Sequence, residues 1–415
     1  MYYYVESIQH SERASRIIST RFVKRDGTVA AGIILVVAEQ DDLQNPAATS
    51  LHRGGRGRSQ VTTAQIGAAI GLSQSAVSKI LRNLVEGFSS DTVEKVRKTA
   101  RQMGYRVNPA ARAMRDGRFG SIGLLAQAVT GWIRAPEDIA WSIGEAVRAR
   151  GLNLTLGRVS DEALASDREL LGLLDEWSVD GLMVSYNMRI PRSMFDLVHR
   201  YRVPAVWLNA KLGADCVHPD DFGAAKALTE HLIELGHRRI AYPTHYGWDA
   251  NEHYSRTDRY DGYADAMRAA GLEPWLLRSP PGMLERDRYA QTARQLALPD
   301  RPSAIITYQN DSAVLWCIVA RMMGLSVPGD LSVASFHQIQ GLSGLGIDLT
   351  AMTYPAEELG RAAVNEVLQK VERPEESRPP QVIPFTFYHG RTTGPLSLHQ
   401  KMGELSQGSD EAAMA

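Results

Sequence analysis

The sequence predicts an α/β protein with two lobes built on parallel sheets, preceded by an all-α head that contains a helix-turn-helix. Two observations support this fold class. From Gly120 onward, short apolar runs alternate with amphipathic helical stretches over about 270 residues, a pattern typical of parallel sheets with helices on both faces. Between Val61 and Gly104, apolar residues instead recur every three or four positions, as in a purely helical domain.

The size and composition exclude several classes of protein. A chain of 415 residues and 45.7 kDa is long enough for two or three domains. Its 44% hydrophobic and 22% charged residues exclude a wholly disordered, collagen-like or coiled-coil protein. The two cysteines, Cys216 and Cys317, exclude a disulfide scaffold and a cysteine-rich zinc site, and they fit a reducing compartment. No apolar run approaches the ~18 residues of a membrane-spanning helix.

Residues 1–60 form a separate segment, which we interpret as an extension and linker. Its apolar run Val29–Ala38 follows Lys24 and Arg25 and has some signal-peptide character, but the long polar region before it and the adjacent Asp26 disfavour export. The run is better explained as a short strand in a poorly ordered extension, or as translation from a start codon upstream of the real one. Residues 39–60 are polar and rich in Gly, Pro and Arg, as in a linker.

Three helices are expected between residues 61 and 106. Ser73 can cap the second of them because its hydroxyl can accept an unpaired N–H of the first turn. Gly71 and Gly104 suit the ends of the first and third helices. The predicted core positions are Ile66, Ala69 and Ile70 in the first helix, Ala76, Val77, Ile80 and Leu81 in the second, and Val93, Val96 and Ala100 in the third.

A short helix is expected next, within residues 107–118. Asn108 is a good N-cap, Pro109 suits the first helical position and Gly117 suits the stop. The helix between them has about two turns, which is unstable alone in water. We therefore expect it to fold only against another surface.

The remaining strands and helices follow in alternation. No glycine-rich nucleotide fingerprint or P-loop follows any of the strands, and no nucleophile–base pair or metal set is recognisable, so an enzyme has little support. The predicted strands are 121–126, 152–157, 180–185, 203–208, 239–243, 302–308 and 331–336, and the predicted helices include 138–151, 168–177, 224–236, 263–271 and 312–324.

The charge is unevenly distributed along the chain. The formal net charge of −1 argues, taken alone, against a nucleic-acid partner. However, residues 53–118 hold thirteen basic and four acidic side chains, for a net +9, which leaves −10 on the rest. Such a basic block is what neutralisation of DNA phosphates requires. It coincides with the helix-turn-helix, whose second helix would enter the major groove.

The order of these parts resembles the lactose-repressor (LacI) family of bacterial transcription regulators. The resemblance covers Val61 to Gly394 and rests on several motifs in order: "TTAQIGAAIGLSQSAVSKIL", "GYRVNPAARAMRDGRFGSIGLL", "VDGLMV", "HLIELGHRRIAY", "RYDGY", "VPGDLSVASF" and "GRTTG". It implies a DNA-binding head at 61–106, a hinge helix at 107–118, a two-lobed, periplasmic-binding-protein-like effector-binding and dimerisation domain at 119–394, and a tail at 395–415.

The resemblance assigns base reading to the start of the second helix. Gln74 and Ser75 occupy these positions, with Lys79 one turn later; Gln can pair with adenine and Lys can donate to guanine. Ser73 and Ser78 would contact phosphates. A purely capping role for Ser73 and a solvated charge for Lys79 are the alternatives.

Further DNA contacts are implied around the hinge. Tyr105, Arg106 and Asn108 match a stretch that touches the DNA backbone in the family, although Val107 replaces the usual proline. Met114 stands where the family usually has a leucine that wedges between base steps; packing within its own domain is the alternative. The hinge-helix residues assigned to DNA are Ala111, Arg112, Met114 and Arg115.

The resemblance also implies effector contacts between the lobes. Arg259 matches an arginine that grips effector oxygens, with an inter-lobe ion pair as the alternative. Asp311 matches a polar position at a strand end, or else caps a helix, and Asp220 matches a position beside the cleft. His337 replaces the usual aspartate, and this departure puts a standard sugar grip in doubt. Asp138 falls, with Glu137, where aromatics usually stack on a sugar; these carboxylates would suit a polyol or a basic effector, and a solvated helix start is the alternative.

These expectations combine into one function. We expect a cytoplasmic, homodimeric transcriptional regulator, most simply a repressor, that binds near-palindromic double-stranded operator DNA and responds to a small carbohydrate-like effector, a sugar or polyol. Inducer and corepressor modes both stay open. The tail lacks three sustained heptads, so we expect dimers rather than tetramers. No catalytic residue, metal, cofactor or membrane partner is expected. The alternative is a periplasmic-type sugar-binding protein without a role in DNA binding.

Overall fold

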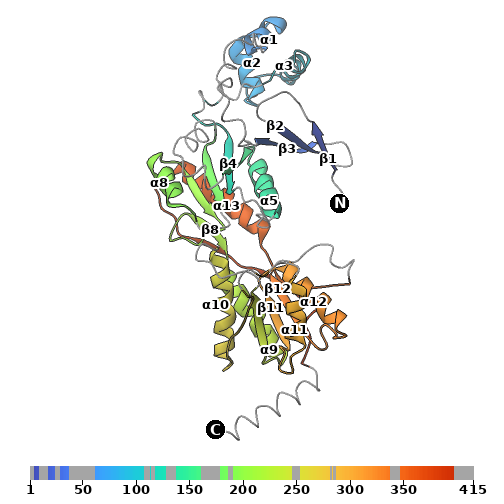
Figure 1. The fold of residues 1–415 in the computed structure, drawn as a ribbon. Helices are drawn as coiled ribbons and strands as arrows, with labels where there is room; N and C mark the ends of the chain where they lie inside the picture. Colours follow the sequence, from blue (N-terminus) through green and yellow to red (C-terminus); the bar gives the residue numbers. More distant parts are fainter. Residues whose placement is uncertain are drawn as a thin grey trace, which may run out of the picture. The chain divides into compact units, whose positions relative to one another are not determined.

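The computed structural model describes residues 4–8, 17–23, 29–36, 61–106, 113, 117–127, 137–159, 178–185, 190–244, 253–280, 283, 287–336 and 346–396. The chain divides into two compact units, Met1–Gly120 and Ser121–Ala415. Each is described by itself (Figure 1). None of the helices in the described ranges combines the length and the apolar character needed to cross a lipid bilayer.

The N-terminal extension contains three strands. They are β1 (Tyr4–Ile8), β2 (Ile17–Val23) and β3 (Val29–Val36), and they pair as an antiparallel meander. The strand expected in the apolar run at Val29–Ala38 is therefore present as β3. The strands β1 and β2 were not expected, because their sequences show no clear alternation of apolar and polar residues.

The head consists of α1 (Thr63–Ile70), α2 (Gln74–Leu81) and α3 (Ser90–Gln102). Each begins at a hydroxyl residue that satisfies a first-turn N–H: Thr62, Ser73 and Ser89 accept from the third residue along. Thr62 also forms a reciprocal capping box with Gln65. The helices enclose a small core of Ile66, Val77, Ile80, Val96 and Ala100.

One predicted core position in the head is wrong. Ala69 is exposed, and Gly67 is the buried small residue of α1. A Cβ atom at residue 67 would lie 2.5 Å from the carbonyl oxygen of Leu72. The turn between α1 and α2 therefore passes directly over Gly67, and Ala69 on the other side of the helix stays in solvent. Gly71 ends α1 in the left-handed conformation, as expected.

Unit 2 contains two lobes, each with its own sheet. In lobe 1 the strands run in the order β5-β4-β6-β7-β8-β14, and all the described pairs are parallel. These elements are β4 (Ser121–Gln127), β5 (Asn153–Val159), β6 (Gly181–Ser185), β7 (Ala205–Leu208), β8 (Cys216–Pro219) and β14 (Gln381–Ile383), with α5 (Glu137–Ala149), α8 (Arg192–Arg200) and α13 (Ala356–Glu372).

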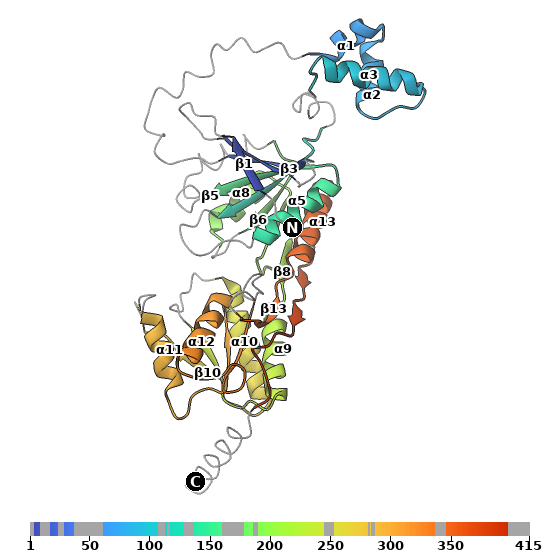
Figure 2. The same ribbon diagram turned by 90° about the vertical axis from the view of Figure 1, so that its right-hand side faces the viewer.

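Both faces of the lobe 1 sheet are covered, as predicted for a parallel sheet. Met183 of β6 faces α5 and α13, which lie side by side in both views (Figures 1 and 2). Its neighbours Leu182 and Val184 point to the other face, where they pack with Met194 and Leu197 of α8. Alternate residues of one strand thus reach opposite helical layers.

Lobe 2 repeats this plan with one antiparallel edge. Its strands run in the order β10-β9-β11-β12-β13-β15, and only the β13–β15 pair is antiparallel among the described pairs. These elements are β9 (Ile240–Thr244), β10 (Trp275–Arg278), β11 (Ala304–Thr307), β12 (Ser332–Phe336), β13 (Thr350–Thr353) and β15 (Thr386–Tyr388), with α9 (Asp221–Glu234), α10 (Tyr254–Ala269), α11 (Arg288–Leu296) and α12 (Asn310–Met322).

The lobe 2 sheet is also sandwiched between helices. Ala304 and Ile306 of β11 pack under α9 and α10, which lie together in Figure 2, and Ile305 packs under α12. The chain passes from one lobe to the other between β8 and α9, between β13 and α13, and between β14 and β15. The two-lobed parallel α/β fold that the sequence predicted is confirmed.

Candidate DNA-reading face and ligand site

The first half of α2 presents the side chains to which the family resemblance assigns base reading. Gln74, Ser75 and Lys79 are exposed, whereas Val77 and Ile80 on the other side of the helix are buried in the head core. Residues four apart lie on one face of a helix, so Ser75 and Lys79 are neighbours. The exposed face of α2 therefore offers an amide, a hydroxyl and an ammonium group to a partner.

The two serines assigned to phosphate contact differ in their surroundings. Ser73 is the N-cap of α2: its Oγ accepts from Ala76 N at 3.2 Å and lies 3.1 Å from Ser75 Oγ. Ser78 is half-buried. The capping role proposed as the alternative for Ser73 is present, and a hydroxyl that accepts one bond keeps its own proton for a second contact.

The end of the head is only partly described. Tyr105 packs against the head core and its N–H donates to Ala100 O at 2.9 Å, while Arg106 is exposed. In the hinge, Ala113 is buried and its carbonyl accepts from Gly117 N at 2.8 Å. The other hinge assignments lie outside the described residues and stay predictions: Asn108, Ala111, Arg112, Met114 and Arg115.

The head keeps a positive surface within its described range of 61–106. Seven basic and three acidic side chains occur in that range, and all ten are exposed. Because these charges are in solvent, they are free to neutralise an anionic polymer rather than one another. The basic residues are Lys79, Arg82, Lys95, Arg97, Lys98, Arg101 and Arg106.

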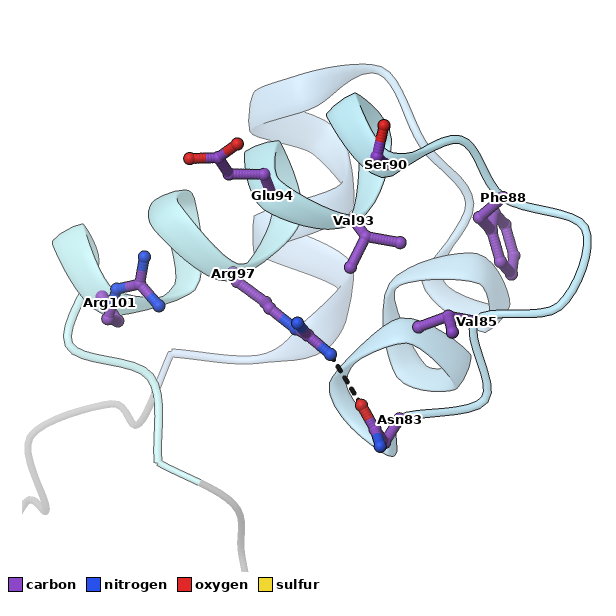
Figure 3. Close-up of a pocket in the computed structure, with 8 residues that line it drawn as sticks. All are labelled: Asn83, Val85, Phe88, Ser90, Val93, Glu94, Arg97 and Arg101. Carbon is purple, nitrogen blue, oxygen red and sulfur yellow. Dashed lines mark hydrogen bonds between the residues drawn. The ribbon is translucent and has the colours of Figure 1, made fainter.

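A surface pocket lies between the loop after α2 and the outer face of α3 (Figure 3). Arg97 crosses it and donates from Nη2 to Asn83 Oδ1 at 2.7 Å, which joins α3 to the residue that leaves α2 in a left-handed conformation. Its lining mixes apolar and charged side chains. The pocket begins after the C-terminal end of α2, at the opposite end from Gln74, so it is separate from the base-reading face. The lining residues are Asn83, Val85, Phe88, Ser90, Val93, Glu94, Arg97 and Arg101.

Arg259, the predicted effector arginine, is buried on α10. Its Nε donates to Asp221 Oδ1 at 2.6 Å and its Nη1 donates to Tyr308 O at 2.8 Å. The guanidinium also lies 4.2 Å from the ring centroid of Phe336 and 4.6 Å from that of Tyr308. The arginine is thus held rigidly between aromatic faces, at the carboxyl ends of β11 and β12 where ligands bind in such sheets.

The carboxylate beside Arg259 is not the predicted one. Asp220 caps α9, with its Oδ1 accepting from Gly223 N at 2.9 Å. The next residue, Asp221, is 1% exposed and pairs with Arg259. Its second oxygen, Oδ2, makes no hydrogen bond to the described residues. The double acid in "VHPDD" was the available signal for both roles, but the sequence does not say which of the two residues faces inward.

The structure does not bring the other predicted effector residues to Arg259 within the described ranges. Asp311 is exposed in the first turn of α12, where its Oδ1 accepts from Ser312 N at 2.8 Å; the N-cap of α12 is Gln309, so the capping role proposed as the alternative for Asp311 is wrong. His337 follows β12 directly but lies outside the described residues. Asp138 is in the first turn of α5, and its side chain is not among those described. Trp316 is buried in the core of lobe 2.

Several polar aromatic residues surround Arg259 that the sequence did not single out. Burial, and then the charge of Asp221, raises the pKa of Tyr254 well above its ordinary value. Burial likewise raises the pKa of Tyr242, whose hydroxyl has no partner among the described residues. Burial lowers the pKa of His253. All three are therefore neutral near pH 7, and their polar atoms lie around an arginine whose charge is balanced by Asp221.

Comparison with known proteins gives a consistent result. Residues 229–393 match the family described as periplasmic binding protein-like domain. The chain is 25% identical over 336 residues to the HTH-type transcriptional repressor PurR of Actinobacillus pleuropneumoniae serotype 3 (strain JL03), a match that covers 78% of this chain and 95% of that protein.

Solved structures share the fold. The lac repressor dimer bound to operator and the anti-inducer ONPF superposes with a TM-score of 0.67 at 21% identity, covering 81% of this chain and 99% of that one. The complex of the transcriptional regulator CelR with cellobiose gives a TM-score of 0.53 at 21% identity, covering 80% and 100%. Both matches extend over more of this chain than the two lobes alone contain.

Proposed function

Because the chain belongs to the LacI family of transcriptional regulators, we propose that it represses transcription as a homodimer on near-palindromic operator DNA, under the control of a small effector. It is a regulator and not an enzyme. The observation that carries the proposal is the exposed face of Gln74, Ser75 and Lys79 on α2, in a basic head that precedes a two-lobed domain.

The proposed DNA interface uses α2 as the reading helix. Gln74 would pair with adenine and Lys79 with guanine in the major groove, while Ser73, Ser78 and the exposed basic side chains would contact phosphates. Two heads would read half-sites one helical turn apart or a multiple of it, about 34 Å or more. The hinge would fold in the minor groove, where Met114 would part a base step.

The proposed effector site lies at the carboxyl ends of the lobe 2 strands. Arg259 is held there beside Tyr308 and Asp221. Neutral hydroxyl-rich ligands suit this setting, because the charge of Arg259 already has a counter-charge in Asp221. We therefore propose a sugar or polyol; the complex of CelR with cellobiose is in keeping with this class. Effector binding would bias lobe closure and so the folding of the hinge.

The test uses the full chain and a library of random duplex DNA. Rounds of selection should recover a near-palindromic site, and fluorescence anisotropy should show log K falling with log salt by about 0.9 per neutralised phosphate. Gln74→Ala should lose about 1–3 kcal/mol of discrimination at one base pair of each half-site. The matched control, Arg373→Gln on the exposed end of α13, should bind like the unchanged protein. Failure to select any site, with salt-independent binding, would refute DNA recognition.

The oligomeric state has its own test. Sedimentation equilibrium at micromolar concentration should give a dimer, because the tail lacks the heptads of a tetramerising helix. A tetramer would overturn this part of the proposal.

A further inference from the structure

A chain of short hydrogen bonds joins the two lobes beside Arg259. It starts at Asn209, the residue that follows β7 of lobe 1 and adopts a left-handed conformation, with φ of 56°. The N–H of Asn209 donates to Val217 O at 2.8 Å, which fixes the position of its own carbonyl. That carbonyl accepts from Nε2 of His253, at the start of α10 in lobe 2, at 2.8 Å.

The hydrogen-bond partners of His253 determine which of its two ring nitrogens carries the proton. The Asn209 carbonyl can only accept, so Nε2 carries the hydrogen. On the other side of the ring, Nδ1 accepts from the backbone N–H of Ser255, which can only donate, so Nδ1 is unprotonated. One neutral tautomer therefore satisfies both contacts. A second proton on Nδ1 would oppose the N–H of Ser255.

The chain continues from His253 to Arg259. Nδ1 of His253 lies 2.8 Å from Ser255 Oγ, which lies 2.8 Å from the hydroxyl of Tyr308. The backbone carbonyl of Tyr308 accepts from Arg259 Nη1. With Tyr308 donating to Ser255, Ser255 to His253 and His253 to Asn209, every donor has an acceptor and all donors point toward lobe 1.

The charged side chains near His253 form two ion pairs. Arg259 and Asp221 neutralise each other, and Asp258 accepts from Lys211 Nζ at 2.7 Å. The Lys211–Asp258 bridge also joins the lobes, but Lys211 is half exposed, so solvent weakens it. Burial, which is the largest influence, lowers the pKa of His253 and keeps it neutral. The buried bond from His253 is therefore stronger than this bridge, and it is shorter than the other inter-lobe bond to Asn209, which Tyr254 donates to Oδ1 at 3.4 Å.

We propose that Asn209, His253, Ser255 and Tyr308 form an inter-lobe link, in which His253 is the positioning residue that couples the effector arginine Arg259 to lobe 1. The role of this link in transmitting effector binding rests on the proposed function. A ligand that moves Arg259 moves Tyr308 with it, and the link carries that displacement to the end of β7. Loss of the link frees the lobes to change their separation.

The test compares two substitutions at one position in the full chain. In His253→Asn the shorter side chain still caps α10 but does not reach Asn209, whereas His253→Gln offers an amide donor at about the reach of Nε2. Spin labels on cysteines introduced at exposed Asp196 of α8 and Arg268 of α10 report the separation of the lobes. The native Cys216 and Cys317 are buried.

We expect His253→Asn to lower the ratio of molecules at the original distance to those at other distances by roughly two- to tenfold, the effect of one lost hydrogen bond. His253→Gln should restore the ratio. Lys211→Gln is the matched control, because it breaks the exposed bridge to Asp258 and leaves the bond from His253 to Asn209 in place, so it should change the ratio less than His253→Asn does. An unchanged distance in His253→Asn, or no rescue by Gln, would overturn the link.

Operator affinity is measured on the same variants with the selected duplex. It should change by a similar factor in His253→Asn and return in His253→Gln. A changed distance with unchanged affinity would overturn the coupling to the head. If the unchanged protein binds no duplex at all, the proposed function fails, whereas the distance measurement still decides whether the link exists.

Discussion

Arg259 donates from Nε to Asp221 Oδ1 at 2.6 Å, and the two side chains are only 4% and 1% exposed. The charge of the predicted effector arginine is therefore balanced inside lobe 2. Its Nη1 is occupied by the Tyr308 carbonyl as well. The arginine thus acts first as a structural joint between α9, α10 and β11, and its role toward a ligand is built on that joint.

Removing Asp221 should destabilise the protein strongly. Asp221→Ala leaves the guanidinium of Arg259 buried without a counter-charge, and we expect the free energy of unfolding to fall by about 3–5 kcal/mol in urea denaturation. The control is Glu145→Ala, which breaks the exposed pair with Arg148 and should cost less than about 1 kcal/mol. Equal small losses in both variants would contradict the importance of the buried pair.

Gly67 should not tolerate a side chain. Its Cβ would lie 2.5 Å from the Leu72 carbonyl, so Gly67→Ala must push the turn between α1 and α2 outward, at a cost of about 1–3 kcal/mol. The position of α2 would shift, and operator affinity should fall. Hydrogen exchange of α1 and α2 in the full chain measures the local loss. Ala69→Ser, on the exposed side of α1, should show protection like that of the unchanged protein.

Stability should depend on pH through His237. Its Nδ1 lies 3.1 Å from Ser303 Oγ, and its Nε2 lies 3.0 Å from Gly394 O and from Ser332 Oγ. Burial lowers the pKa of His237 to about 4, below its ordinary value of 6.5. The unfolded chain therefore binds a proton more readily, so stability is complete above pH 6.5 and declines as the pH falls toward 4. The shift corresponds to about 3 kcal/mol.

The measurement is urea denaturation at several pH values between 7 and 4. His237→Gln removes this titration and should make the decline in unfolding free energy less steep, although the variant is less stable at pH 7. His199→Gln, on the exposed side of α8, should keep the original slope. A slope in His237→Gln identical to that of the unchanged protein would show that His237 does not cause it.

Met114 is expected to act as a wedge in the operator. Met114→Ala should weaken binding to the selected operator more than binding to random duplex, because only the specific complex parts a base step. Met114→Leu should retain the preference, since Leu keeps the apolar bulk. Competition titrations with both DNAs give the ratio. Equal losses on both would remove the wedge role.

Local sequence patterns were enough for much of the head and the sheets. The caps at Ser73 and the stop at Gly71 depend on neighbouring residues only, so they are readable without the fold. The alternation of buried strands and helices in unit 2 is equally local. Prediction from local patterns failed for two helices that are stabilised by packing against distant parts of the chain. The helix α10 begins at Tyr254, well before the expected start, and α13 was not expected. The requirement for glycine at position 67 likewise comes from the turn at Leu72, whose carbonyl leaves no room for a Cβ atom.

Composition, periodicity and ordered motifs are enough to predict the order of the parts, the basic charge of the head and the resemblance to the family. Which of two adjacent aspartates contacts Arg259 depends on the folded chain. Asp220 and Asp221 are the same residue type, but at the start of α9 their side chains point in different directions. Asp220 accepts from an N–H of the first turn, whereas Asp221 points into lobe 2 and pairs with Arg259. The link from His253 to Asn209 likewise joins residues 44 positions apart, which no local pattern encodes.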